Sequence, residues 1–292
     1  MFCGSYPITP ATEILQELSK HKSLNVRTFQ AEDEIGGITS SIGAAFAGNF
    51  AVTTTSGPGL ALKGEAIGLA MITELPLLIV NVQRGGPSTG LPTKTEQSDL
   101  LQALYGRNGE APVPVIAAST PSNCYDFAFR ASKIALEHMT PVILLTDGFL
   151  ANGSQPMQIH HTDTLPKIKV PLAKFKEGEE YLPYERDEKT MVRKWAIPGT
   201  PGLEHRIGGL EKMDKTGTVS YVPENHQLMT EFRERKVELV VNDIPEQEVI
   251  GDLDADLLVV GWGGTYGHLL TAVHDLQDEG KRISLAHFNY IK

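Results

Sequence analysis

Residues 32–37, Glu-Asp-Glu-Ile-Gly-Gly, open an Ala- and Gly-rich segment that continues to Gly48. Apolar residues recur along this segment at helical spacing, which predicts a helix that stops at the glycine. Asp and Glu near a helix N-terminus complement the helix dipole, and this explains two of the three acids. Glu34 points to the same face as Ile38, so we expect it to be half-buried and a candidate acid/base group.

Strand and helix patterns alternate around this helix from residue 1 to about 150, which predicts a doubly wound, mostly parallel α/β sheet. The residues before Pro7 have the pattern of the end of a strand or a turn. Thr9 is a suitable N-cap and Pro10 a suitable first residue for the first helix. The other predicted strands are 26–29, 50–54, 77–82, 113–118 and 141–147, and the other predicted helices are 60–73, 97–105 and 121–138, the last with Tyr125, Phe129 and Ile134 inward.

Two loops follow predicted strands at positions where α/β sheets bind ligands. Residues 53–59 form a hydroxyl- and Gly-rich turn, which offers N–H groups and hydroxyls to a ligand, although an ordinary loop could have the same composition. Arg84 begins a Gly/Ser/Thr loop after the strand 77–82. An arginine there is suited to bidentate capture of a carboxylate, and the alternative is a surface arginine.

The chain changes character after about residue 152, and we divide it into residues 1–160, an irregular connecting region 161–250, and 251–292. Residues 224–236 predict a charged, solvated helix, and His160 and His161 are interpreted as solvated rather than metal-binding. Strand, helix and strand patterns at 256–261, 266–279 and 283–288 predict the start of a second α/β domain. The chain stops at Lys292 without further strands, so we expect this domain to be incomplete.

Composition excludes several classes of partner. The net charge of −10 argues against nucleic acid and anionic membranes. No apolar run reaches the roughly 18 residues of a membrane span, and no signal peptide pattern opens the chain, so we expect a cytoplasmic protein. Cys3 and Cys124 are the two cysteines. They are too few for an iron–sulfur cluster, which takes four ligands, and we interpret both as small buried hydrophobes.

Four motifs occur in order, and together they resemble one family. They are Tyr-Pro-Ile-Thr-Pro at 6–10, Glu-Asp-Glu at 32–34, Thr-Ser-Gly-Pro-Gly at 55–59 and Arg-Gly-Gly-Pro-Ser-Thr-Gly at 84–90. The chain resembles the alpha subunit of 2-oxoacid:ferredoxin oxidoreductases, most of all the 2-oxoglutarate type, strongly to about residue 160 and more weakly from about residue 250. The resemblance implies a pyrimidine-binding domain for thiamine diphosphate, followed by a transketolase C-terminal-like domain. The chain departs from the family at its ends, because members have a further strand before Tyr6 and a longer second domain.

The resemblance also implies roles for single residues. Glu34 matches the glutamate that bonds N1′ of the cofactor's aminopyrimidine ring, and residues 56–58 (Ser56, Gly57 and Pro58) match the cofactor-binding turn. Thr9 and Arg84 match the residues that contact and hold the substrate carboxylate. The implied reaction oxidises a 2-oxoacid with CoA to acyl-CoA and CO₂ and reduces ferredoxin.

The chain lacks the Gly-Asp-Gly and Asn pattern typical of a diphosphate–Mg²⁺ site, so no metal site is expected in it. The resemblance places Mg²⁺ and the iron–sulfur cluster on a beta subunit, with thiamine diphosphate shared between the two chains. One alternative is a subunit of a ferredoxin-independent thiamine diphosphate decarboxylase or a transketolase-like enzyme. Another is a nucleotide-binding regulatory module that uses the Gly-rich turn 261–267, which lacks the ribose-binding acid of the dinucleotide fingerprint. Pyruvate and branched-chain 2-oxoacids remain alternatives to 2-oxoglutarate.

Overall fold

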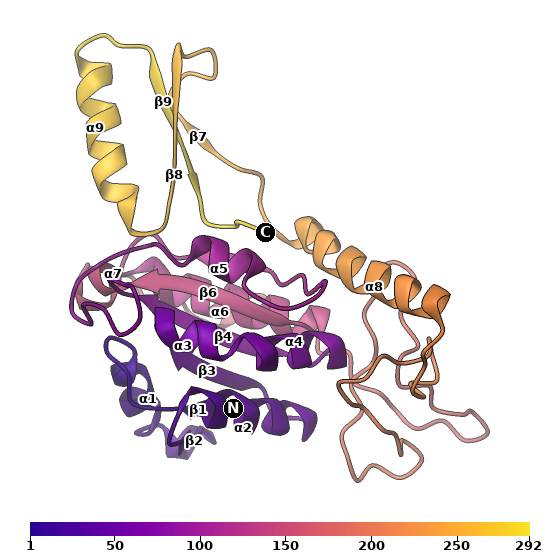
Figure 1. Cartoon of the computed structure of the whole chain (residues 1–292). Helices are drawn as coiled ribbons and strands as arrows, with labels where there is room; N and C mark the ends of the chain where they lie inside the picture. The colour runs from indigo at the N-terminus through magenta and orange to yellow at the C-terminus, as the bar shows by residue number, and fades with distance from the viewer.

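A six-stranded parallel sheet lies at the centre of the computed structural model, which describes all 292 residues (Figure 1). The strand order is β2-β1-β3-β4-β6-β5, so the chain winds outward in both directions from the middle of the sheet. This confirms the predicted doubly wound fold. The strands are β1 (Phe2–Ser5), β2 (Arg27–Gln30), β3 (Ala51–Thr55), β4 (Leu77–Gln83), β5 (Val115–Ala117) and β6 (Pro141–Asp147).

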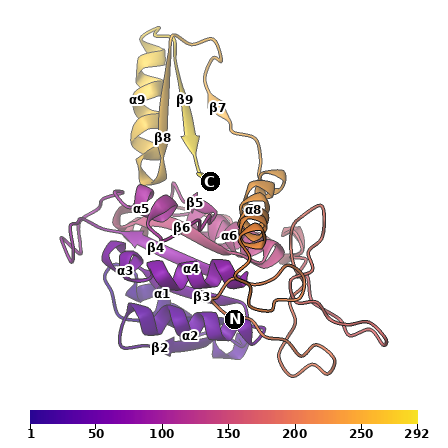
Figure 2. The same ribbon diagram turned by 45° about the vertical axis from the view of Figure 1, so that its right-hand side comes forward.

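Helices cover both faces of this sheet, as Figure 2 shows from a second side. Because β4 and β6 are buried along their whole length, they are apolar on both faces rather than alternating. One face packs against α2 (Glu34–Phe46), α3 (Gly57–Leu62), α4 (Gly64–Thr73) and α5 (Leu100–Tyr105), and the other against α6 (Asn123–His138) and the segment before α1 (Thr12–Leu18). The short helix α7 (Gly148–Asn152) follows β6 directly.

The beginning of the chain differs from the sequence-based expectation in two ways. Residues 2–5 form a strand, β1, between β2 and β3, where the sequence predicted only the end of a strand or a turn. The first helix begins at Thr12 rather than after Thr9. A turn delays it, because the Ala11 N–H donates to the Ile8 carbonyl at 2.7 Å and the Ile8 N–H donates to Thr12 Oγ1 at 2.9 Å.

Two other helices were predicted with errors of detail. The predicted helix 60–73 is divided at Lys63 into α3 and α4. On α6, Tyr125 is 43% exposed, whereas Phe127 is buried. The inward stripe of α6 runs through Phe127, Ala131 and Ile134, at helical spacing, so Tyr125 falls on another face.

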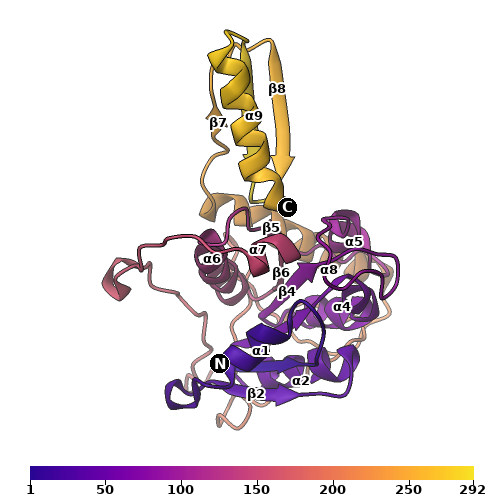
Figure 3. The ribbon, with the colours of Figure 1, turned by 90° about the vertical axis from the view of Figure 1, so that its left-hand side faces the viewer.

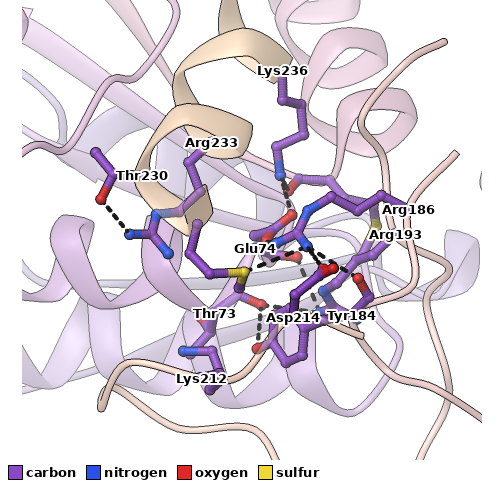
Figure 4. A network of polar contacts seen from close by, with 12 residues as sticks. Thr73, Glu74, Tyr184, Arg186, Arg193, Lys212, Asp214, Thr230, Arg233 and Lys236 are labelled. Carbon is purple, nitrogen blue, oxygen red and sulfur yellow. Dashed lines mark hydrogen bonds and ion pairs between the residues drawn. The ribbon is translucent and has the colours of Figure 1, made fainter. Parts of the chain in front are cut away.

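The connecting region is irregular, and it is attached to the sheet domain by buried charges. Glu74 ends α4 in a left-handed conformation with a fully buried side chain. Arg186 and Lys236 pair with its carboxylate, and Arg193 donates to its carbonyl at 3.1 Å (Figure 4). Helix α8 (Pro223–Glu238) is therefore not only a solvated helix as predicted, since its Arg233 and Lys236 are buried.

A second, three-stranded sheet stands at the far end of the chain, with α9 (Tyr266–Asp278) against it (Figure 3). Strands β8 (Leu257–Trp262) and β9 (Ile283–Phe288) are parallel, and β7 (Val249–Ile250) is antiparallel to β9. The last residues return to the first sheet, where the Ile291 N–H donates to the Val115 carbonyl at 2.9 Å. The remaining regular elements are the single 3-10 turns η1 (Lys22–Leu24), η2 (Thr162–Thr164), η3 (Leu239–Asp243) and η4 (Gly263–Thr265).

None of the helices combines the length and the apolarity that a membrane crossing requires. Cys3 is fully buried and Cys124 is half-buried, and both thiols are free. Burial raises the pKa of the Cys3 thiol to about 12 and that of Cys124 to about 11. Both side chains are therefore protonated near neutral pH and unreactive as thiolates.

Candidate active site

The four sequence motifs meet at the carboxyl edge of the first sheet. Residues 6–10 follow β1, Glu34 opens the helix after β2, residues 56–59 follow β3, and Arg84 follows β4. Because all of these strands are parallel, their carboxyl ends lie at the same edge, which is where open α/β sheets bind ligands.

Glu34 is the first residue of α2 and is half-buried, as predicted. The preceding Asp33 is the N-cap, and its Oδ1 accepts a hydrogen bond from the Gly36 N–H at 2.7 Å. The helix N-terminus is thus capped by Asp33, and the Glu34 carboxylate is not needed for that purpose. Glu34 is therefore available for another role.

A close approach of three elements forms the wall beside Glu34. The hydroxyl groups of Tyr6 and Thr55 lie 3.0 Å apart, and both face Gly59 at the start of α3. A Cβ at position 59 would collide with both hydroxyls and would lie 2.9 Å from Glu34 Cγ. Burial raises the pKa of Tyr6 well above its usual value, so its hydroxyl keeps its proton.

Arg84 and Thr9, the two predicted carboxylate-binding residues, are in direct contact. Arg84 is buried, and its Nη1 donates to the Thr9 main-chain carbonyl at 2.6 Å. The contact uses only the main chain of Thr9, and Thr9 as a whole is exposed. Arg84 Nε is buried without a hydrogen-bond partner. A guanidinium anchored on one side, with a free donor on another, can bind a carboxylate.

The turn 56–58 packs against a buried polar side chain, Asp99. Asp99 accepts from Asn81 Nδ2 at 2.9 Å, and its N–H donates to Gln83 Oε1 at 3.1 Å. The Asp99 carboxylate lies 3.0 Å from where a Cβ on Gly57 would be, so the turn is in close contact with this carboxylate. Burial raises the pKa of Asp99. The buried Ser56 hydroxyl has no partner within the chain, which fits a turn that contacts a ligand.

Sequence reasoning missed Lys63 and Asp99. Lys63 is fully buried, and its Nζ donates to the Glu34 carbonyl at 2.7 Å. The available signal was a single lysine in the otherwise small and apolar run 57–64. Asp99 had no such signal, because its partners on β4 are far from it in sequence and the residues around it are polar.

A cavity of 610 Å³ lies elsewhere, between α6 and the segment that leads into the second sheet. In its lining, Asn123 Oδ1 accepts hydrogen bonds from main-chain N–H groups, whereas both ring nitrogens of His287 are buried without a partner. We place the site at the sheet edge because the four sequence motifs converge there, together with the unpartnered groups Ser56 Oγ and Arg84 Nε.

The Gly-rich turn at 261–267 does not present a phosphate site. Gly263 and Gly264 are buried, and a Cβ on Gly264 would collide with the Asp147 carboxylate. Gln97 Nε2 donates to the Trp262 carbonyl at 3.1 Å. The turn is therefore a contact between the two sheets, and the carboxylate there would repel a phosphate.

Comparison with known proteins shows the family of the chain. Residues 1–222 match the family model for the thiamine diphosphate-binding domain of pyruvate flavodoxin/ferredoxin oxidoreductase. The chain belongs to this family. Relatives of similar sequence include the 2-oxoglutarate oxidoreductase subunit KorA of Mycobacterium tuberculosis, 56% identical over 99% of this chain and 44% of that protein. They also include the 2-oxoglutarate synthase subunit KorA of Methanothermobacter thermautotrophicus, 33% identical over 99% of this chain and 76% of that protein.

One solved structure has the same fold over almost the whole chain. It is the 2-oxoglutarate:ferredoxin oxidoreductase of Magnetococcus marinus, solved with 2-oxoglutarate, coenzyme A and succinyl-CoA bound. The TM-score is 0.91 at 37% identity, and the match covers 99% of this chain and 50% of that one. The chain thus spans about half the length of the mycobacterial and Magnetococcus relatives.

Proposed function

We propose that this chain is the pyrimidine-binding part of the alpha subunit of a 2-oxoglutarate:ferredoxin oxidoreductase. The observation that supports this proposal is the convergence of Glu34 with the Arg84–Thr9 pair at one sheet edge. Relatives named for 2-oxoglutarate favour this 2-oxoacid over pyruvate and branched-chain acids.

The residues present fit the pyrimidine end of thiamine diphosphate. A half-buried carboxylate, Glu34, and an unpartnered buried hydroxyl, Ser56 Oγ, lie on neighbouring elements at this edge. Glu34 would hold and exchange a proton at the ring atom N1′, and residues 56–58 would contact the cofactor. When bound, the cofactor supplies the electron sink that stabilises a carbanion next to a carbonyl group.

Arg84 would bind the carboxylate of the 2-oxoacid with its free donors, while its bond to the Thr9 carbonyl keeps the guanidinium in one orientation. Binding the reacting acid at a fixed angle lowers the entropic part of the barrier. Residue 9 would form the wall next to that carboxylate.

The rest of the machinery is proposed to lie on a partner beta subunit, namely the diphosphate–Mg²⁺ site and the iron–sulfur cluster. No group of three or more His, Cys, Asp or Glu side chains in this chain could hold a metal ion. CoA and ferredoxin are the proposed co-substrates. We propose a cytoplasmic location from the free thiols of Cys3 and Cys124. Two cysteines cannot supply the four ligands of an iron–sulfur cluster, which is why we propose that the cluster lies on the partner.

An assay of the complete enzyme tests the proposal. The full-length subunit is co-purified with its partner, and CoA-dependent reduction of a viologen dye is measured with 2-oxoglutarate, pyruvate and a branched-chain 2-oxoacid. We expect thiamine diphosphate-dependent activity that is greatest with 2-oxoglutarate. Activity without CoA, or equal activity without a cluster-bearing partner, would support the ferredoxin-independent alternative instead.

A further inference from the structure

Lys63 is a buried cation that directly contacts the residue proposed to act on the cofactor. It lies between α3 and α4, and its side chain is fully buried. Its Nζ donates to the main-chain carbonyl of Glu34 at 2.7 Å and lies 4.8 Å from the centre of the Tyr6 ring. Lys63 thereby connects α2, the α3–α4 junction and the loop after β1.

The ammonium has unusual surroundings for a buried charge. It forms no ion pair, and its hydrogen-bond acceptor is a carbonyl rather than a carboxylate. Burial lowers the pKa of Lys63 to about 8, although the negative charges of Glu34 and Asp33 act in the opposite direction. Placing an unpaired cation in a buried site costs free energy, and an apolar side chain of similar volume would avoid that cost.

We propose that Lys63 is a positioning residue for Glu34, which it holds in place by hydrogen bonding to the first turn of α2. This inference rests on the proposed function for the role of Glu34, but the contact itself belongs to this chain. The N-cap bond of Asp33 fixes the helix at one point. The Lys63 bond fixes it from the buried side at the residue that carries the reacting carboxyl group, which neither Asp33 nor the apolar face of α2 can do.

Lys212 provides a matched control. It is also buried, burial also lowers its pKa to about 8, and its Nζ also donates to main-chain carbonyls, those of Gly208 and Leu210, both at 2.9 Å. It lies in the connecting region rather than beside Glu34. Methionine at either position keeps about the same side-chain volume and removes the hydrogen-bond donor. Glutamine keeps a donor, its side-chain amide, on a shorter side chain.

Two measurements on the complete enzyme test the proposal. The first is amide hydrogen exchange of residues 34–38 without cofactor, and the second is C2 proton exchange of bound thiamine diphosphate. We expect Lys63→Met to speed amide exchange there and to slow C2 exchange on the order of 10²-fold, the size of effect that misplacing a reacting group can have. Lys63→Gln should give intermediate values, and Lys212→Met should leave both unchanged.

Three results would overturn the inference: wild-type values in Lys63→Met, no recovery in Lys63→Gln, or equal effects at position 212. If Lys63→Met does not assemble, the comparison of Lys63→Gln with Lys212→Gln decides, because only the former should alter exchange at residues 34–38. Failure of the proposed function is recognised separately, as a wild-type enzyme without 2-oxoacid activity. The amide exchange comparison remains informative in that case.

Discussion

At the scale of single residues, adjacent acids at the start of α2 have different tasks. Asp33 caps the helix through its Oδ1, whereas Glu34 is half-buried and faces the wall formed by Tyr6, Thr55 and Gly59. The sequence predicted a half-buried Glu34 and acids that complement the helix dipole, but it did not predict that Asp33 is the N-cap. It did not predict the bond from Lys63, since nothing local relates position 63 to position 34.

The substitution Glu34→Gln keeps the shape of the side chain and removes its ability to exchange a proton. Glutamine is nearly isosteric, so cofactor should still bind in the assembled enzyme. It cannot exchange a proton with a ring nitrogen, and the loss of such a role typically lowers a rate ~10²–10⁴-fold. C2 proton exchange of bound cofactor, followed by NMR after quenching, measures this. Asp33→Asn is the control, because asparagine is an equally good N-cap and should leave the exchange rate unchanged. Equal rates in wild type and Glu34→Gln would remove Glu34 from the chemistry.

Arg84→Lys should impair 2-oxoacid use almost as much as Arg84→Ala. Arg84 donates to the Thr9 carbonyl and keeps further donors for a carboxylate, whereas a lysine has no planar fork that can do both. We expect kcat/KM for 2-oxoglutarate to fall, because transition-state binding is weakened by about 2–4 kcal/mol, and we expect cofactor affinity to be unchanged. Arg107→Lys is the control, since Arg107 also bonds main-chain carbonyls but lies beyond α5. Wild-type kinetics in Arg84→Lys would exclude a bidentate carboxylate contact.

At the scale of elements, the buried strands and the main helices were predictable, and the short or interrupted elements were not. The apolar runs of β4 and β6 identify strands buried on both faces. β1 was read only as a strand end, because its four residues include Gly4 and Ser5. The N-cap pattern at Thr9 was misleading, since a turn closed by Thr12 Oγ1 precedes the helix.

Gly59→Ala tests how closely α3 approaches β1 and α2. The added methyl group would collide with the hydroxyls of Tyr6 and Thr55, so we expect destabilisation of about 1–3 kcal/mol and weaker cofactor binding in the assembled enzyme. Gly68→Ala is the matched control in α4, where a Cβ meets nothing within 4 Å. That change should stabilise the protein by roughly 0.5–1 kcal/mol, because alanine favours a helix interior. Thermal unfolding measures both, and equal stability of the two variants would contradict the predicted contact.

At the scale of the whole molecule, long-range charges hold the connecting region in place. Arg186 and Lys236 reach Glu74 from 112 and 162 residues away in sequence. Such pairs leave no local pattern, which explains why α8 was predicted to be a solvated helix. The sheet could be predicted because its signal is local, whereas the attachment of residues 184–238 depends on which distant segments meet in the fold.

Acid should therefore release the connecting region. Burial alone would raise the pKa of Glu74, but the charges of Arg186, Lys236 and Arg193 outweigh it and lower this pKa below the ordinary 4.5. Burial alone would also raise the pKa of Glu211. The hydrogen bond from Arg233, with those from Lys212 and His226, outweighs burial and lowers this pKa to about 2. A carboxylate with a lowered pKa stabilises the folded state above its unfolded pKa, and this contribution is lost as pH falls toward its folded pKa.

The free energy of unfolding should thus fall as pH drops from about 4.5 toward about 2, the interval between the ordinary pKa of both groups and the lowered pKa of Glu211. Glu211→Gln should reduce this slope, because the group that takes up the proton is gone. Glu74→Gln should lower stability by about 3–5 kcal/mol near neutral pH, since it leaves Arg186 and Lys236 buried without their carboxylate. Glu179→Gln is the control, because its pair with Lys176 is exposed and worth little. Urea unfolding at a series of pH values decides, and identical slopes in wild type and Glu211→Gln would show that this carboxylate is not a source of the acid sensitivity.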